Sequence, residues 1–103
     1  MPTFIILMKL TEEGIKTLKD GPERVREHAK LMEELGSKMT GFYLTMGEYD
    51  YIAIGDFPND EIAGALVLGL NASGLIKTTT LKAFTLEEFE KMSKIYRDHV
   101  SKM

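Results

Sequence analysis

The sequence lacks cysteine altogether and has only two histidines, His28 and His99, among its 103 residues. The absence of cysteine excludes disulfide bonds, thiolate metal ligands and a cysteine nucleophile. Two imidazoles are also too few for a histidine-rich metal site within one subunit. We therefore expect no metal site.

An excess of positive charge and a long apolar run are missing too. Thirteen Lys and Arg residues stand against 16 Asp and Glu residues, and the net charge is -3. The basic residues are scattered, so no nucleic-acid partner is expected. No apolar run reaches the roughly 18 residues of a membrane helix, and the N-terminus lacks the features of a signal peptide. We expect a cytoplasmic protein without a membrane partner.

Glycine-rich motifs of the P-loop or dinucleotide type are also absent, so no cofactor is expected. What is present is an ordinary globular composition, with 44% hydrophobic and 28% charged residues. It predicts a single domain over residues 1–103, with a core over 2–85 and a C-terminal helix over 86–102. A domain of this size buries only about 60 to 65% of its unfolded surface, so an exposed apolar sheet face would favour self-association.

Hydrophobic patterns along the chain predict four strands, over residues 2–10, 38–46, 50–57 and 75–84. Helical segments are predicted over residues 11–20, 22–35, 60–71 and 86–102. The starts of these helices carry capping signals, namely Thr11, Pro22 after Gly21, Asn59, and a capping box of Thr85 with Glu88.

The order of the elements predicts a ferredoxin-like βαββαβ fold, an α+β architecture with a four-stranded antiparallel sheet and an additional C-terminal helix. Both crossover helices lie on one face of such a sheet. Residues 2–10 carry apolar side chains on both faces of the predicted strand. This pattern indicates that the other face of the sheet is covered as well. Either the C-terminal helix of the same chain or the sheet of a second subunit could cover it. We favour the second subunit, which would form a dimeric α/β barrel and bury more apolar surface.

The connection between the second and third strands predicts a tight β-hairpin. Gly47 and Glu48 as its two central residues would form a type II′ turn. This register places polar side chains together on one face of the sheet. The expected opposed pairs are Thr45 with Asp50 and Tyr43 with Ile52.

Two interpretations of this hairpin stay open. In the structural one, which we favour, Gly47 supplies a positive φ and the Asp50 carboxylate accepts hydrogen bonds from backbone amides or Thr45. In the functional one, a ligand-binding pocket is lined by Tyr43, Thr45, Tyr49 and Asp50.

His28 and Asp50 are the candidates for a catalytic proton acceptor. His28 follows Val25 by three residues and precedes Met32 by four, so its side chain could lean toward the apolar face of its helix. A histidine at the solvent edge or satisfied in the core is the simpler interpretation. The alternative is an imidazole that points into a pocket between helix and sheet and accepts a proton near neutral pH.

The stretch FYLTMGEYDYIAIGDFPND at residues 42–60 resembles the GYD-domain family. Nearly the whole chain shares the resemblance, which also rests on Thr11, Gly14 and Ile15, on Asp20 and Pro22, and on Ala83 to Thr85. It implies a ferredoxin-like fold related to the dimeric α/β-barrel proteins, with small subunits that assemble into dimers or larger rings. It brings no catalytic residues. The hairpin alone is also similar to the effector-binding domains of leucine-responsive regulators, where a G-x-Y-D element lies near an amino-acid site at a subunit interface.

These observations lead to three hypotheses on function. The first, which we favour, is a homo-oligomeric module that binds a small molecule at or beside the hairpin residues. The second is a cofactor-independent oxygenase or isomerase of the dimeric α/β-barrel type, by analogy of fold. The third is a structural protein whose role is to form an assembly.

Overall fold

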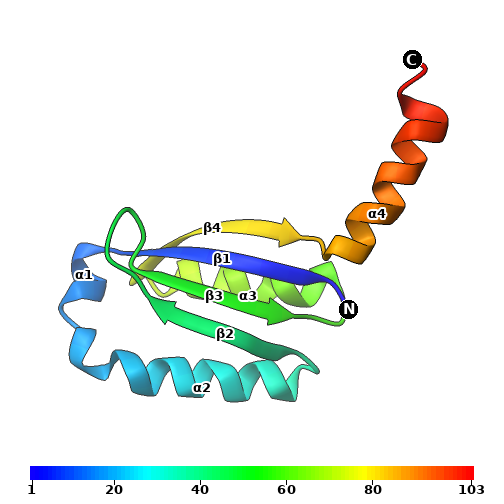
Figure 1. Ribbon diagram of the computed structural model, residues 1–103. Coiled ribbons are helices and arrows are strands. Elements are labelled where there is room, and N and C mark those ends of the chain that lie inside the picture. The colour runs from blue at the N-terminus through cyan, green and yellow to red at the C-terminus, as the bar shows by residue number, and fades with distance from the viewer.

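Four antiparallel strands form one sheet in the order β2-β3-β1-β4 in the computed structural model, which describes all 103 residues (Figure 1). This order and the helices that connect the strands confirm the predicted ferredoxin-like α+β fold. Each predicted strand is present, with ends shifted by one or two residues. The strands are β1 (Thr3–Leu10), β2 (Lys38–Leu44), β3 (Tyr51–Asp56) and β4 (Ile76–Ala83).

The helices follow the prediction except in two places: over residues 11–20 one helix was expected and two short pieces are found, and the predicted C-terminal helix continues as a π-helix after Ile95. The Thr17 hydroxyl donates to the Gly14 carbonyl at 2.9 Å, and the Thr17 N–H bonds the same oxygen at 3.1 Å. This local bonding competes with the helical ladder and ends the first piece. None of the helices combines the length and apolar character that a membrane span requires. The helical segments are α1 (Glu12–Ile15), η1 (Leu18–Asp20), α2 (Gly21–Glu34), α3 (Asp60–Ala72), α4 (Leu86–Ile95) and the π-helical η2 (Tyr96–Val100).

The predicted side-chain caps are confirmed at three helix starts. Thr11 accepts from the Gly14 N–H at 3.1 Å, and Asn59 accepts from the Ile62 N–H at 2.9 Å. Thr85 and Glu88 form the full capping box, with bonds of 3.1 and 2.9 Å. The backbone hydrogen bond from Thr85 holds the pKa of the Glu88 carboxyl below its ordinary value.

The core lies between the sheet and the two crossover helices. Phe57, immediately after β3, is only 1% exposed and is the most deeply buried large side chain. Its ring packs edge-on against Phe4, with ring centroids 5.6 Å apart. Core residues come from the sheet and from both helices, so one cluster joins the two layers. The buried core residues are Phe4, Ile6, Met8, Met32, Tyr51, Ala53, Phe57, Ala63 and Leu66.

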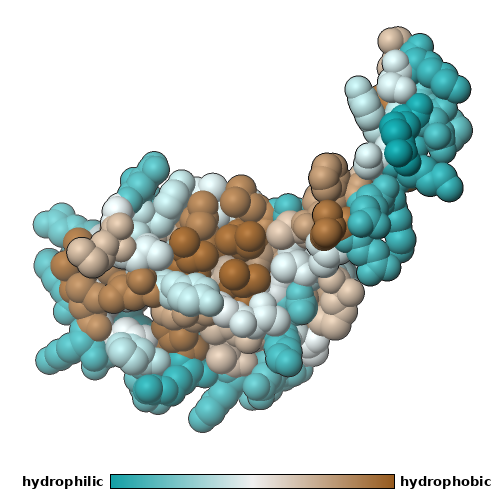
Figure 2. Space-filling model, viewed as in Figure 1, coloured by the Kyte–Doolittle hydropathy of each residue, from teal (hydrophilic) through white to brown (hydrophobic).

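The opposite face of the sheet has no cover within the chain. Figure 1 shows α4 leaving the end of β4 and projecting away from the sheet, and no other element crosses this face. The alternative in which the chain's own C-terminal helix lies over the sheet is therefore wrong. We call this surface the open face, and Figure 2 shows it as an apolar patch at the centre of the view.

The β2–β3 connection has the predicted register but not the predicted turn. Tyr43 pairs with Ile52, and the Thr45 N–H donates to the Asp50 carbonyl at 2.8 Å. Four residues, 46–49, then form the loop, because no backbone hydrogen bond closes a two-residue turn between Met46 and Tyr49. Gly47 has a φ of 149°, far from the roughly +60° of the first central residue in a II′ turn. The predicted register is nevertheless correct, because Thr45 and Asp50 form the last pair before the connection in the predicted turn and in the observed loop alike.

Candidate functional site

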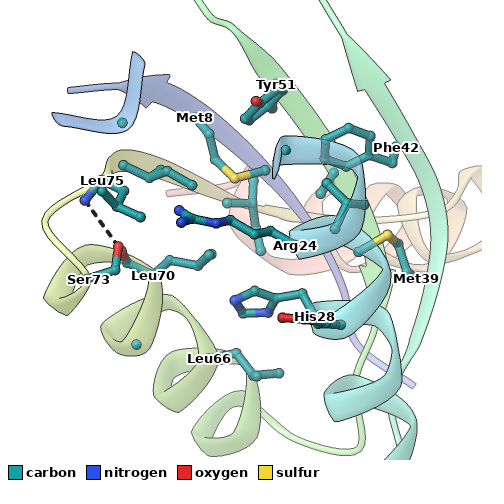
Figure 3. A pocket seen from close by; sticks show the side chains of 18 of the residues that line it. Met8, Arg24, His28, Met39, Phe42, Tyr51, Leu66, Leu70, Ser73 and Leu75 are labelled. Carbon is teal, nitrogen blue, oxygen red and sulfur yellow. Dashed lines mark hydrogen bonds between the residues drawn. The ribbon is translucent and has the colours of Figure 1, made fainter. Parts of the chain in front are cut away.

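A groove of about 360 Å³ lies between α2 and α3 on the covered side of the sheet. It forms because α3 packs against β4 while α2 packs against β2, at opposite edges of the sheet. The central strands are its floor (Figure 3). Sixteen of its 24 lining residues are hydrophobic, as is common for small-molecule sites. The lining includes Met8, Arg24, Glu27, His28, Tyr51, Leu66 and Gly69.

The wall formed by α2 carries the polar groups of the groove. Arg24, His28 and Met32 stand four residues apart, so they lie along one line of the helix. Met32 is buried in the core, which places Arg24 and His28 on the inner side of α2. Figure 3 shows both side chains reaching from α2 toward Leu66 and Leu70 of α3.

His28 is half-buried in this wall, and burial lowers the pKa of its imidazole below the ordinary 6.5. Desolvation disfavours the charged form, so the ring is neutral at pH 7. A neutral imidazole offers one hydrogen-bond donor and one acceptor. His28 is thus the predicted catalytic candidate that reaches a pocket between helix and sheet.

Arg24 has no acidic partner within 4 Å. Its Nη1 donates to the hydroxyl of Thr17 at 3.2 Å, a contact that steadies the side chain without neutralising it. Arg26 of the same helix, which does not line the groove, pairs with Glu23 at 3.4 Å. The guanidinium of Arg24 is therefore free to bind an acidic ligand, whereas that of Arg26 is already engaged in an ion pair.

The opposite wall is fastened to the sheet by Asn71. Its amide nitrogen donates to the Thr78 hydroxyl at 2.8 Å, and its oxygen accepts from the Thr78 N–H at 3.3 Å. These bonds hold the end of α3 on β4. Gly69, two residues earlier, lines the groove, and a Cβ there would meet nothing within 4 Å. The groove is consequently open at this point of α3.

Asp50 lies outside the groove, in the connection between β2 and β3. Its Oδ2 accepts from the Leu10 N–H at 2.8 Å, and its own N–H donates to the Met8 carbonyl at 2.8 Å. Both bonds extend the pairing between β3 and β1 beyond the last ladder pair, Met8 with Tyr51. The carboxylate therefore clamps the loop to the end of β1.

The other predicted ligand-binding residues are divided between two surfaces. Thr45 donates its hydroxyl to the Tyr49 carbonyl, so both belong to the same loop as Asp50. Lys9 Nζ lies 5.9 Å from the centroid of the Tyr49 ring. Tyr43, 60% exposed, stands on the open face. The structure brings Thr45, Tyr49 and Asp50 together but places none of the four residues in the groove, and their ligand-binding role stays a prediction.

Arg24 lines the groove but was not among the functional residues predicted from the sequence. The available signal was its spacing of four from His28 and eight from Met32, on a helix with an apolar face. No group of three or more His, Asp or Glu side chains with a metal-binding arrangement occurs in the structure.

Comparison with known proteins gives a family match, a relative and two similar structures. The family model of the GYD domain matches residues 4–93. A protein of Thermus thermophilus named "Glutamine synthetase and cystathionine beta-lyase binding protein" is 33% identical over 89 residues, which cover 85% of this chain and 94% of that protein. The crystal structure of FFRP-DM1 is similar with a TM-score of 0.59 and 20% identity, over 82% of this chain and all of that one.

The crystal structure of TTHA0845, also from Thermus thermophilus, is similar with a TM-score of 0.50 and 22% identity, over 82% of this chain and 95% of that one. Both structural likenesses concern the fold alone. They agree with the ferredoxin-like arrangement described above.

Proposed function

The chain belongs to the GYD-domain family, and on that premise we propose that it is a homo-oligomeric binding protein that pairs through the open face of its sheet and takes a small molecule as ligand. The pairing of subunits is supported mainly by the apolar open face. The observation that supports the ligand is the groove on the other side of the same sheet.

Alternate residues of the central strands build the open face. The register places Ile5 and Leu7 of β1 beside Ile54 and Ile52 of β3. These four side chains are only partly buried within the subunit. Contiguous apolar surface of this kind marks an interaction site in soluble proteins. Two further apolar residues flank the four at the neighbouring strands, Tyr43 and Leu81, which are 60% and 46% exposed.

A second copy of the sheet offers the same apolar chemistry, but the sheet alone is a small interface. Four strands about 4.8 Å apart and about seven residues long at 3.3 Å give a footprint of roughly 450 Å² per subunit. Stable interfaces bury about 800 Å² per subunit. Additional contact from outside the sheet would bring the buried area to that of a stable interface.

The arm formed by α4 and η2 can supply that contact. It begins where β4 ends and carries apolar side chains that no part of its own chain covers. We propose that the arm of each subunit lies against its neighbour and completes the interface. The exposed apolar residues of the arm are Leu86, Phe89, Met92, Ile95, Tyr96 and Val100.

Light scattering tests the pairing. The unmodified chain is expected to have at least twice the 11.6 kDa mass of one subunit. Leu7→Lys places a charge at the centre of the open face, where pairing would bury it without a partner, and should give the mass of a monomer with an unchanged circular-dichroism spectrum. Leu68→Lys is the matched control, because Leu68 is 73% exposed on α3 and should leave the mass unchanged. A folded Leu7→Lys variant with the mass of the unmodified oligomer would rule out this interface.

A protein partner is the second candidate, favoured by the name of the Thermus thermophilus relative, which refers to binding of two enzymes. Under this candidate the oligomer would carry another protein on surfaces left free after pairing. Co-elution of the purified oligomer with glutamine synthetase or cystathionine β-lyase, against the oligomer alone, measures it. A catalytic role would rest on His28, because Asp50 is engaged by the Leu10 amide.

A further inference from the structure

We propose that the groove between α2 and α3 binds a small apolar monocarboxylate, whose charged end meets Arg24 and whose hydrocarbon part lies on the floor of the sheet. This inference rests on the proposed small-molecule binding and specifies its site and ligand class. The site is distinct from the hairpin residues, none of which line the groove.

The size and lining of the groove favour a ligand that is mostly hydrocarbon. Its volume of about 360 Å³ lies at the lower end of the roughly 300 to 1,000 Å³ typical of ligand pockets. Met8 and Tyr51 on the floor and Leu66 on α3 are core residues whose apolar atoms continue into the groove. Leu18 and Leu31 of the same lining are 44% and 42% exposed, so an apolar ligand would remove their side chains from water, at about 25 cal/mol for each Å² buried.

The charges of the groove favour a single negative charge on that ligand. Arg24 and Glu27 are the only charged residues in the lining, and they form no ion pair with each other. A guanidinium presents a planar fork that matches a carboxylate with two parallel hydrogen bonds. Thr17 already holds one nitrogen of this fork in place, which lowers the entropy lost on binding.

His28 limits the charge that the groove can accept. Its imidazole is neutral at pH 7 because burial lowers its pKa, so it adds a hydrogen-bonding group and no second positive charge. A phosphate with two negative charges would then face one cation and the carboxylate of Glu27. A monocarboxylate carries half that charge, so Glu27 repels it less while the unpaired arginine still matches it.

The first experiment compares charged and neutral ligands of one shape on the full chain. Octanoate and 4-phenylbutyrate are titrated calorimetrically at pH 7.5, against octanamide and 4-phenylbutanamide. Each carboxylate should bind at least tenfold more tightly than its amide. Arg24→Met should remove this tenfold preference, whereas Arg26→Met, which deletes the same charge from a residue of α2 that does not line the groove, should keep it.

A second pair of variants tests the place of binding. Gly69→Leu adds a bulky side chain to a residue that lines the groove and whose Cβ would meet nothing within 4 Å, so the protein should fold and lose at least tenfold in affinity. Gly64→Leu makes the same change on α3, also with nothing within 4 Å, but outside the groove lining, and should bind as the unmodified chain does.

Equal affinity for acid and amide, or equal loss in Arg24→Met and Arg26→Met, would overturn the ligand class while small-molecule binding stands. Unchanged affinity in Gly69→Leu would overturn the site. Absence of binding by all four compounds would overturn the inference, and the proposed pairing would still be decided separately by the mass of Leu7→Lys.

Discussion

Alanine at Gly14 is expected to lower the free energy of unfolding by about 3 kcal/mol, at the upper end of the usual cost of overpacking. A Cβ at this position would lie 2.1 Å from the backbone oxygen of Leu75 and 3.1 Å from Cδ2 of Leu10. The Leu75 oxygen cannot easily move, because it accepts the Thr11 N–H at 2.9 Å. Thr11 also donates its hydroxyl to the Gly74 carbonyl at 2.7 Å. The methyl group would therefore separate α1 from the start of β4.

Thermal unfolding at a fixed protein concentration measures this effect, since unfolding of an oligomer depends on concentration. A loss of about 3 kcal/mol corresponds to a fall in Tm of roughly 12 to 24 °C for a domain of this size. Gly64→Ala is the control, because its Cβ meets nothing within 4 Å and alanine is the better helix former by about 0.5 to 1 kcal/mol. The same substitution should thus raise the Tm at Gly64. Equal effects at both glycines would contradict the close approach at Gly14.

The parts of the fold that the sequence predicted correctly depend on short-range interactions. Thr11, Asn59 and the Thr85–Glu88 pair each cap a helix through a side chain close in sequence to the amide that it bonds. Such signals act within one turn of the chain, so they can be recognised without the tertiary structure. The strand register followed in the same way, from alternation and the pair Thr45 with Asp50.

The features that escaped prediction depend on distant residues. The bond from Leu10 to the Asp50 carboxylate joins residues 40 positions apart, and it holds a loop that local turn preferences would have made shorter. Arg24 resembles any charged residue of an exposed helix until the separation of α2 from α3 opens the groove beside it. Likewise, nothing in the pattern of residues 86–102 distinguishes a helix that folds back on its own sheet from one that projects away from it.

The two proposed activities use opposite faces of the same strands. In β1, Met8 faces the groove and Leu7 faces the open face, and β3 repeats this arrangement with Tyr51 and Ile52. Because side chains alternate along a strand, a substitution at one residue affects the groove and a substitution at the next residue affects the open face. The alternation also places a ligand in the groove within one strand thickness of the proposed subunit interface.

Asp50→Ala is expected to lower the free energy of unfolding by about 2 kcal/mol, because a hydrogen bond to a charged group contributes about 1.5 to 3 kcal/mol. The substitution leaves the Leu10 N–H, which donates to the carboxylate at 2.8 Å, without a protein partner. The backbone bond from Asp50 to the Met8 carbonyl remains, so the loop should loosen without loss of the strand register. Urea denaturation followed by circular dichroism gives the change in stability.

Glu48→Ala is the matched control for this variant. Glu48 is exposed in the same loop and takes part in no ion pair, so its removal changes the net charge equally without loss of a contact. Its stability should stay within about 0.5 kcal/mol of the unmodified chain. If Asp50→Ala behaved like Glu48→Ala, the carboxylate would not be needed to hold the loop. It would then be available for the ligand-binding role predicted together with Tyr43, Thr45 and Tyr49. That role would be identified if metabolites raised the Tm of the unmodified chain but not that of Asp50→Ala.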